Sequence, residues 1–313
     1  LVLFAGCVSA VPAQLQPAPS QPDSHRIYLD VVVTPKSGVP VPGLQKSDFT
    51  VLDNKATRPI VTFDEFGGPQ SPIEIVLLVD AVNTTYTNLS YERQQIDNFL
   101  RANGGHLAHP TSLAIFTDTG TQIQQDFSSD GNELSAAFDK ADIGLREIRR
   151  GAGFYGAEDR LTLSLNALQM LTAKEAARPG RKIILWISPG WPYLSGPNVD
   201  IDSKQERQLF AEIVALSTQL RTAGITLYSI DPLGSNENVS WELYYQSFLK
   251  GVAKPNQAQP GDLGLQVLAV QSGGLALSAS NDIAGRIAHC IADLGAYYRL
   301  SFDAPPAEHP DEY

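Results

Sequence analysis

The strongest constraint on the fold is a set of short, continuously apolar segments that alternate with amphipathic ones. Residues 73–79 read IEIVLLV, residues 182–188 read KIILWIS and residues 225–230 read ITLYSI. The segments at 91–101, 160–174 and 204–223 have helical spacing of their apolar side chains. Strands that are apolar on both faces and separated by helices form a parallel sheet covered on both sides. The sequence therefore predicts an α/β protein with a doubly wound, mostly parallel sheet.

Shorter alternating strands flank this region. We expect the α/β domain to span residues 72–296, an amino-terminal β segment residues 25–71, and a second β segment residues 297–313. Such small sets of strands cannot bury a core alone. We therefore expect the last strand to return to the first segment, so that a small β-sandwich-like domain flanks or encloses the α/β domain. Because the sequence stops at Tyr313 without a natural finish, we expect the last β segment to be truncated.

The first residues predict export. Residues 1–13 combine an apolar core with small residues before Gln14, like the remnant of a secretory signal peptide cleaved after Ala13. Alternatively, FAGC is an imperfect lipoprotein box with Cys7 as the lipid anchor. Residues 14–24 form a Pro- and Gln-rich linker. We expect a protein that is secreted or resides in the periplasm or cell envelope.

The net charge argues against two classes of partner. The chain has a formal charge of -11 at pH 7 and no dense Lys/Arg run, so nucleic acid and anionic membrane surfaces are not expected to bind. No segment after the first residues approaches the roughly 18 apolar residues of a transmembrane span. A protein is the expected partner.

Three predicted strands end in polar residues, and an open parallel sheet binds ligands at the carboxyl ends of its strands. The first end is Asp80, followed by Asn83 and Thr84. The other two are Ser188, before Pro-Gly, and Asp231. We expect these ends to meet at one edge of the sheet.

The chain resembles a von Willebrand factor A (VWA) domain. The resemblance rests on the strand ending in Asp80, the helix after it, the Asp118-Thr119-Gly120 hairpin and the segment KIILWISPG. The segments LDVVVTPKSGVPVPGLQKSDFTVLDN and YYRLSF are also similar to a secreted bacterial family called VWFA-related, of the acidobacterial type. This resemblance covers nearly the whole chain after the linker. It implies a VWA fold and an adhesion-type function.

The resemblance also implies a metal-ion-dependent adhesion site, with the motif Asp-x-Ser-x-Ser. Asp80 matches the first Asp and Thr84 the second hydroxyl, and Asn83 adds an amide oxygen. Val82 replaces the first Ser and has no donor oxygen. The implied site is degenerate, binding Mg²⁺ or another divalent cation weakly through Asp80, Asn83 and Thr84. The alternative is that these side chains cap the loop between strand and helix.

Two further parts of the family's site are altered. Ser188 lies in the region of the second Asp, and the loop at residues 151–160 contains no Thr. Glu158 or Asp159 could substitute there, and Asp118 is a candidate to support the ligands through hydrogen bonds.

The segment after Ser188 supplies a candidate partner-binding face. Trp191 and Tyr193 follow the strand end, and exposed aromatic side chains often anchor interfaces. We place Ser188, Trp191, Tyr193 and the loop at residues 151–159 on this face. The alternative is that the aromatic side chains pack against a neighbouring loop.

These features predict a non-enzymatic binding module. The main alternative is a structural envelope module without metal or ligand, and a third is a hydrolase with Asp80 and Asp231 as paired carboxylates. His106 and His109 are expected to be ordinary histidines of a Gly-rich connection, and Cys290 a buried core residue.

Overall fold

The computed structural model describes residues 26–35, 40–67, 73–124, 126–141, 153–178, 180–191, 194, 201–232, 261, 263–277, 282–292, 294 and 296–305. The expected signal peptide, with Cys7, and the linker at residues 14–24 lie outside the described residues, as does Tyr193.

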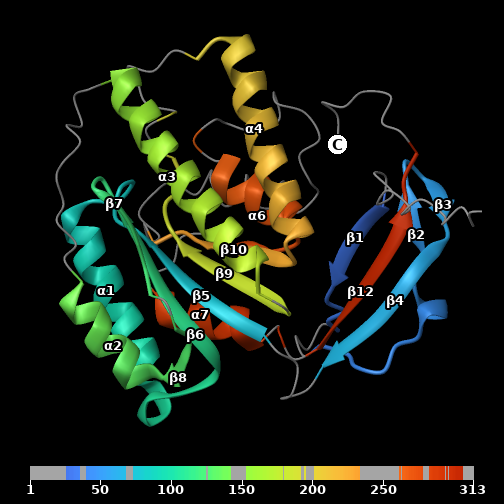
Figure 1. The fold of residues 1–313 in the computed structure, drawn as a ribbon, viewed down its shortest axis with the longest axis horizontal. Coiled ribbons are helices and arrows are strands. Elements are labelled where there is room, and N and C mark those ends of the chain that lie inside the picture. The colour runs from blue at the N-terminus through green and yellow to red at the C-terminus, as the bar shows by residue number, and fades with distance from the viewer. Residues whose placement is uncertain are drawn as a thin grey trace, which may run out of the picture.

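A large sheet lies between the helices of the α/β part of the molecule, with the strand order β11-β10-β9-β5-β6-β7 and β8 paired to β6 (Figure 1). Its strands are β5 Ile73–Asp80, β6 His106–Thr117, β7 Gly120–Ile123, β8 Ser128–Asp130, β9 Arg181–Ile187, β10 Ile225–Ile230 and β11 Ala276–Leu277. Five neighbouring strands are parallel to one another, namely β6, β5, β9, β10 and β11. Strands β7 and β8 run antiparallel to β6. The predicted α/β class with a doubly wound, mostly parallel sheet is confirmed.

Helices cover both faces of the sheet (Figure 1). The helices are α1 Tyr86–Arg101, α2 Gly131–Lys140, α3 Gly153–Ala176, α4 Ser203–Thr222, α6 Ala269–Gln271 and α7 Ile283–Ala292, with the π-helix η7 Leu263–Leu268 before α6 and the 3-10 turns η1 Lys46–Asp48 and η2 Ala102–Gly105. Alternate residues of β5 point to opposite faces. Val76 and Leu78 join the core under α3 and α4, and Leu77 joins the core under α1, α2 and α7.

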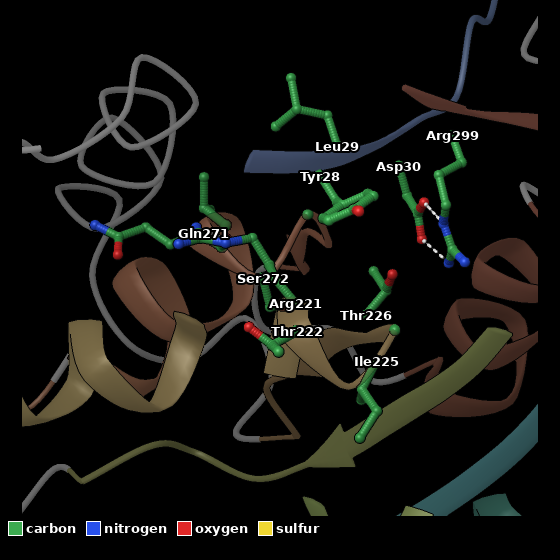
Figure 2. A pocket seen from close by; sticks show the side chains of 13 residues that line it. Tyr28, Leu29, Asp30, Arg221, Thr222, Ile225, Thr226, Gln271, Ser272 and Arg299 are labelled. Atoms are coloured by element: carbon green, nitrogen blue, oxygen red, sulfur yellow. Dashed lines mark hydrogen bonds and ion pairs between the residues drawn. The ribbon is translucent and has the colours of Figure 1, made fainter. Parts of the chain in front are cut away.

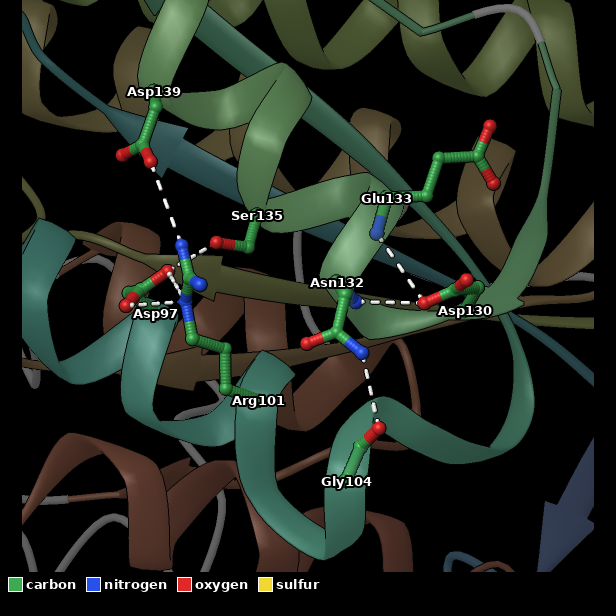
Figure 3. Close-up of polar contacts among 8 residues, drawn as sticks. All are labelled: Asp97, Arg101, Gly104, Asp130, Asn132, Glu133, Ser135 and Asp139. Carbon is green, nitrogen blue, oxygen red and sulfur yellow. Dashed lines mark hydrogen bonds and ion pairs between the residues drawn. The ribbon is translucent and has the colours of Figure 1, made fainter.

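Polar contacts connect α1 with the start of α2 (Figure 3). The carboxylate of Asp97 accepts hydrogen bonds from Nε of Arg101, at 2.8 and 2.9 Å, and from the hydroxyl of Ser135. Asp130 caps α2 by accepting from the backbone N–H of Asn132 at 2.9 Å. The Asp130 bond satisfies a helix-end N–H group that has no partner within the helix, whereas the Asp97 bonds join the side chains of α1 and α2.

The remaining strands form a small sheet of order β1-β12-β4. Its members are β1 Arg26–Val31, β12 Ala296–Asp303 and β4 Ile60–Gly67, and both pairings are antiparallel. A separate hairpin consists of β2 Val51–Asp53 and β3 Ala56–Arg58. Its turn residues Asn54 and Lys55 have positive φ angles of 49° and 67°, as a two-residue hairpin turn requires. The pairing of β12 with β1 shows the expected return of the last strand to the first β segment.

Two local predictions were wrong. His106 and His109 lie on β6, so neither histidine belongs to the predicted Gly-rich connection. The predicted loop at residues 151–160 is helical from Gly153 onward. Ala157 in this part of α3 packs into the core, so tertiary burial extends the helix beyond its amphipathic segment.

Candidate functional site

The register of the large sheet brings the predicted strand ends together. Val79 of β5 pairs with Ile187 of β9, so the next residues, Asp80 and Ser188, lie side by side. Asp231 follows β10, the other neighbour of β9. We call Asp80, Asn83, Thr84 and Ser188 the strand-end cluster, and all four are buried.

The carboxylate of Asp80 is held by four donors from the chain itself. Its Oδ1 accepts from the backbone N–H groups of Val82 and Asn83, both at 2.9 Å. Its Oδ2 accepts from Nδ2 of Asn83 at 2.9 Å and from the hydroxyl of Ser188 at 2.5 Å. Asp80 and Ser188 are both 0% exposed. The carboxylate therefore organises the turn from β5 to α1 and joins it to the end of β9.

Helix α3 supports this turn from one side. Nδ2 of Asn83 also donates to Oγ of Ser164 at 2.9 Å, and that hydroxyl donates to the backbone oxygen of Arg160 at 2.8 Å. The guanidinium of Arg160 in turn donates to the backbone oxygen of Val82. The sequence did not indicate Ser164 or Arg160, because neither follows a strand nor matches a motif.

Helix α1 adds a buried acid that sequence reasoning missed. The hydroxyl of Thr84 donates to Oε1 of Glu92 at 2.9 Å, and Glu92 is 0% exposed. A signal was present, because Glu92 shares the apolar helix face of Leu89 and Ile96, where an acid is unusual.

Burial changes the acidity of both carboxyl groups. Burial raises the pKa of Asp80 to about 6, although hydrogen bonds from Ser188, Asn83 and Val82 act in the opposite direction. Burial also raises the pKa of Glu92 to about 8, with a smaller contribution from the negative charges of Asp80 and Asp231. At neutral pH Glu92 therefore holds its proton and Asp80 is mostly ionised.

The strand-end cluster does not fit an octahedral Mg²⁺ ion as it is arranged here. Each oxygen of Asp80 already accepts two hydrogen bonds, and the hydroxyl of Thr84 is directed to Glu92. Val82 lies in the apolar core. Among the described residues, no three Asp, Glu, His or Cys side chains are grouped to hold a metal. The carboxylate of Asp80 caps the turn, whereas Oδ1 of Asn83 is buried without a hydrogen-bond partner. Weak cation binding at the cluster stays a prediction.

The predicted aromatic face is wrong for Trp191. Its side chain is 1% exposed and packs against Trp186, with ring centroids 5.8 Å apart. Its backbone N–H donates to the backbone oxygen of Gly261 at 3.0 Å. Gly264 permits this packing, since a Cβ there would lie 2.9 Å from Trp186 and 3.2 Å from Trp191. Ser188 is likewise buried and unable to touch a partner.

The other predicted ligands take no part in the hydrogen bonds of the Asp80 carboxylate. Glu158 and Asp159 are exposed on α3, just before Arg160. Asp118 lies in the turn between β6 and β7, and its Oδ1 is buried without a hydrogen-bond partner. Cys290 is buried in the core, as predicted.

Comparisons with known proteins give a likeness of fold only. No family model matches the chain, and no curated protein matches it. A crystal structure of the human COPII-coat protein Sec24c is similar at 10% identity and a TM-score of 0.33, covering 56% of this chain and 29% of that one. The TFIIH p34 N-terminal domain is similar at 12% identity and a TM-score of 0.41, covering 71% of this chain and 97% of that one. The chain thus spans less than a third of the Sec24c chain, and values this low carry no argument about function.

A search of the described helices for membrane spans found none of sufficient length and apolar character.

Proposed function

We propose that the chain is an exported, non-enzymatic protein-binding module of the VWFA-related type. It would present the carboxyl-end edge of its large sheet to a protein partner, and do so without a metal ion. The observation that carries this proposal is the saturation of Asp80 by four hydrogen bonds from the chain. A carboxylate engaged in this way shapes the edge and leaves contact with the partner to neighbouring exposed residues.

The burial of the strand-end cluster argues against catalysis there. A nucleophile or general base has to reach the atom on which it acts. Asp80 and Ser188 are fully buried, and the hydroxyl of Ser188 donates to a carboxylate instead of to a histidine. The hydrolase alternative needs Asp80 at the surface with Asp231, and Asp80 is not accessible.

The exposed rim beside the strand-end cluster suggests the chemistry of the partner. Glu158 and Asp159 are exposed on α3, next to Arg160, which contacts the turn after β5. Both are acidic, so this part of the edge fits a partner that presents Lys or Arg side chains. The rim replaces the buried Trp191 and Ser188 as the proposed contact surface.

A site-specific crosslink tests this surface. A photoreactive residue placed at position 158 should give a discrete adduct in an envelope or culture extract of the source organism. The same residue at position 57, exposed on the β2–β3 hairpin, serves as the control. The adduct should disappear when Asp159 is changed to Lys. Equal labelling from both positions, or none, would favour the structural module without a ligand.

Export rests on the apolar first residues and has its own test. In the native host, the mass of the mature protein should correspond to a chain beginning at Gln14. A chain that begins at Cys7 with an added lipid mass would support the lipoprotein alternative. A chain that retains residues 1–13 and stays in the cytoplasm would contradict export.

A further inference from the structure

A cavity of about 330 Å³ lies between the small sheet and the α/β body (Figure 2). One wall comes from residues 28–30 of β1 and from Arg299 of β12, and the other from the end of α4, the start of β10 and the end of α6. The cavity lies at the amino end of β10, whereas the strand-end cluster follows the carboxyl ends of the neighbouring strands. A ligand in this cavity is therefore separate from the edge proposed to bind a protein.

The described lining of the cavity carries more positive than negative charge. Its charged side chains are those of Arg221, Arg299 and Asp30. Arg299 donates to the two carboxylate oxygens of Asp30 at 2.8 and 3.1 Å, as Figure 2 shows. Arg221 donates to the backbone oxygen of Gln271 at 2.6 Å and to the hydroxyl of Thr218 at 2.9 Å, neither of which carries a full charge. Two guanidinium groups thus line the cavity with a single carboxylate among its described residues.

A third guanidinium group next to Asp30 increases this excess. Arg181, the first residue of β9, is 2% exposed, and its Nε lies 3.8 Å from Oδ2 of Asp30. Nε and Nη1 of Arg181 are buried without a hydrogen-bond partner. One carboxylate cannot neutralise both Arg181 and Arg299, and a buried charge without a counter-charge is costly. The carboxyl end of α4 offsets only about half a charge, so this region stays positive in a chain whose formal charge is -11.

The cavity offers apolar surface beside this positive charge. Figure 2 draws Tyr28 and Thr226 between Arg221 and Arg299. Tyr28 is 49% exposed, and Val270 also lines the cavity. An aromatic ring such as that of Tyr28 packs well against another ring or a hydrocarbon chain. The volume is near the lower end of the roughly 300–1,000 Å³ typical of small-ligand sites. The cavity is therefore suited to a small molecule with both an anionic and an apolar part.

We propose that this cavity binds a small organic acid, with its carboxylate facing the guanidinium groups and its apolar part on the ring of Tyr28. The planar guanidinium group of arginine matches the geometry of a carboxylate. A ligand carboxylate supplies a second negative charge beside Asp30, where three guanidinium groups gather. A neutral ligand would leave that charge excess in place, and inorganic phosphate would leave the apolar surface uncovered.

The acid would contact both parts of the molecule. Tyr28 and Arg299 belong to the small sheet, whereas Arg221 and Thr226 belong to the α/β body. Binding should therefore stabilise the protein as well as fill the cavity. This inference is independent of the function proposed for the strand-end edge.

Titration with acids and their amides tests the proposal. Benzoate and hexanoate are added to the full chain, and binding is followed by protein-detected NMR. Benzamide and hexanamide have nearly the same shape without the charge, and inorganic phosphate has the charge without the apolar part. At least one acid should bind saturably and shift the signals of Tyr28 and Thr226. Its amide should bind about tenfold more weakly, because a hydrogen bond to a charged group is lost.

Two substitutions should change the affinity for the acid in opposite directions. Arg221→Gln removes a lining cation and should weaken binding about five- to tenfold. Asp30→Asn removes the one carboxylate of the described lining and should tighten binding about three- to fivefold, because it ends a like-charge repulsion. Arg101→Gln, at an exposed position of α1, alters the net charge as Arg221→Gln does and should leave binding unchanged.

Three outcomes would overturn the inference. The first is the absence of saturable binding by either acid, including the case in which only phosphate binds. The second is binding of the amides that equals binding of the acids. The third is an equal effect of Arg221→Gln and Arg101→Gln, which would indicate a response to net charge alone. If Asp30→Asn fails to fold, Arg221→Gln decides, because it leaves the contacts of Asp30 with Arg299 and Arg181 intact.

Discussion

The hydroxyl of Ser188, after β9, donates a hydrogen bond of 2.5 Å to the carboxylate of Asp80, at the end of β5. This bond links two parallel strands at the edge where proteins of this architecture bind ligands. Because Oδ2 of Asp80 also accepts from Asn83, the contact leaves little of the carboxylate for an external group. The strand-end cluster is best understood as a structural element centred on the saturated carboxylate of Asp80, although Oδ1 of Asn83 is buried without a hydrogen-bond partner.

Removing the serine hydroxyl should destabilise the protein. Ser188→Ala deletes a buried hydrogen bond to a carboxylate, which typically contributes about 2 kcal/mol. Denaturant unfolding at pH 7.5 measures the loss. Ser135→Ala is the matched control, since its hydroxyl also donates to a carboxylate, that of Asp97. Asp97 is partly exposed and is also held by Arg101, so the control should lose less. Equal losses in the free energy of unfolding would show that the buried Ser188–Asp80 hydrogen bond contributes no more to stability than the Ser135–Asp97 bond.

Divalent cations should not stabilise the wild-type chain. A site with a Kd of about 10 μM would add roughly 2.7 kcal/mol at about 1 mM metal, a shift of a few degrees in Tm. Because both oxygens of Asp80 are occupied by chain donors, we expect equal Tm values in EDTA and in Mg²⁺, Mn²⁺ or Ca²⁺. A rise in Tm that Asp80→Ala abolishes would instead establish the degenerate adhesion site.

Much of the strand-end geometry could be predicted from the sequence. The runs IEIVLLV and KIILWIS are apolar on both faces, which fixes buried strands, and parallel strands bring Asp80 and Ser188 to one edge. The binding partners of the Asp80 carboxylate could not be predicted, because a carboxylate at a strand end suits either a cation or backbone N–H groups. Only the positions of the turn after Asp80 and of Ser164 on α3 decide between them.

The aromatic segment shows where prediction from sequence fails. Trp191 follows a strand end, and that position alone favours exposure. Its burial depends on Gly261 and Gly264, which are distant in the sequence and lie beside it only in the folded chain. The start of α3 is a similar case, because burial of Ala157 extends the helix through a segment with two glycines.

Filling the space at Gly264 should therefore destabilise the core. The added Cβ of Gly264→Ala would lie within 2.9 Å of Trp186 and 3.2 Å of Trp191. Overpacking of this kind costs about 1–3 kcal/mol. Trp191→Phe replaces the indole by a smaller ring, so the double variant should lose less than the sum of the single losses. Strict additivity in urea unfolding would mean that the two sites do not share a contact.

Stability should fall as the pH rises, because Glu92 is a buried acid. Its pKa is about 8 in the folded chain, above the ordinary value of 4.5. Between these values the folded state keeps the proton and the unfolded state loses it, so the free energy of unfolding decreases with pH. The slope approaches one proton, at most about 1.4 kcal/mol per pH unit. Asp80, with its pKa raised to about 6, adds to the slope at the acidic end.

The variant Glu92→Gln tests this assignment directly. Glutamine retains the oxygen that accepts from Thr84 and cannot ionise, so the variant should lose most of the decline between pH 6 and 8. Relative to the wild type, its stability should increase steadily over that range in denaturant unfolding. Glu212→Gln, at an exposed position of α4, should retain the wild-type slope. A wild-type slope in Glu92→Gln would mean that another group controls the pH dependence and that Glu92 ionises without difficulty in the folded protein.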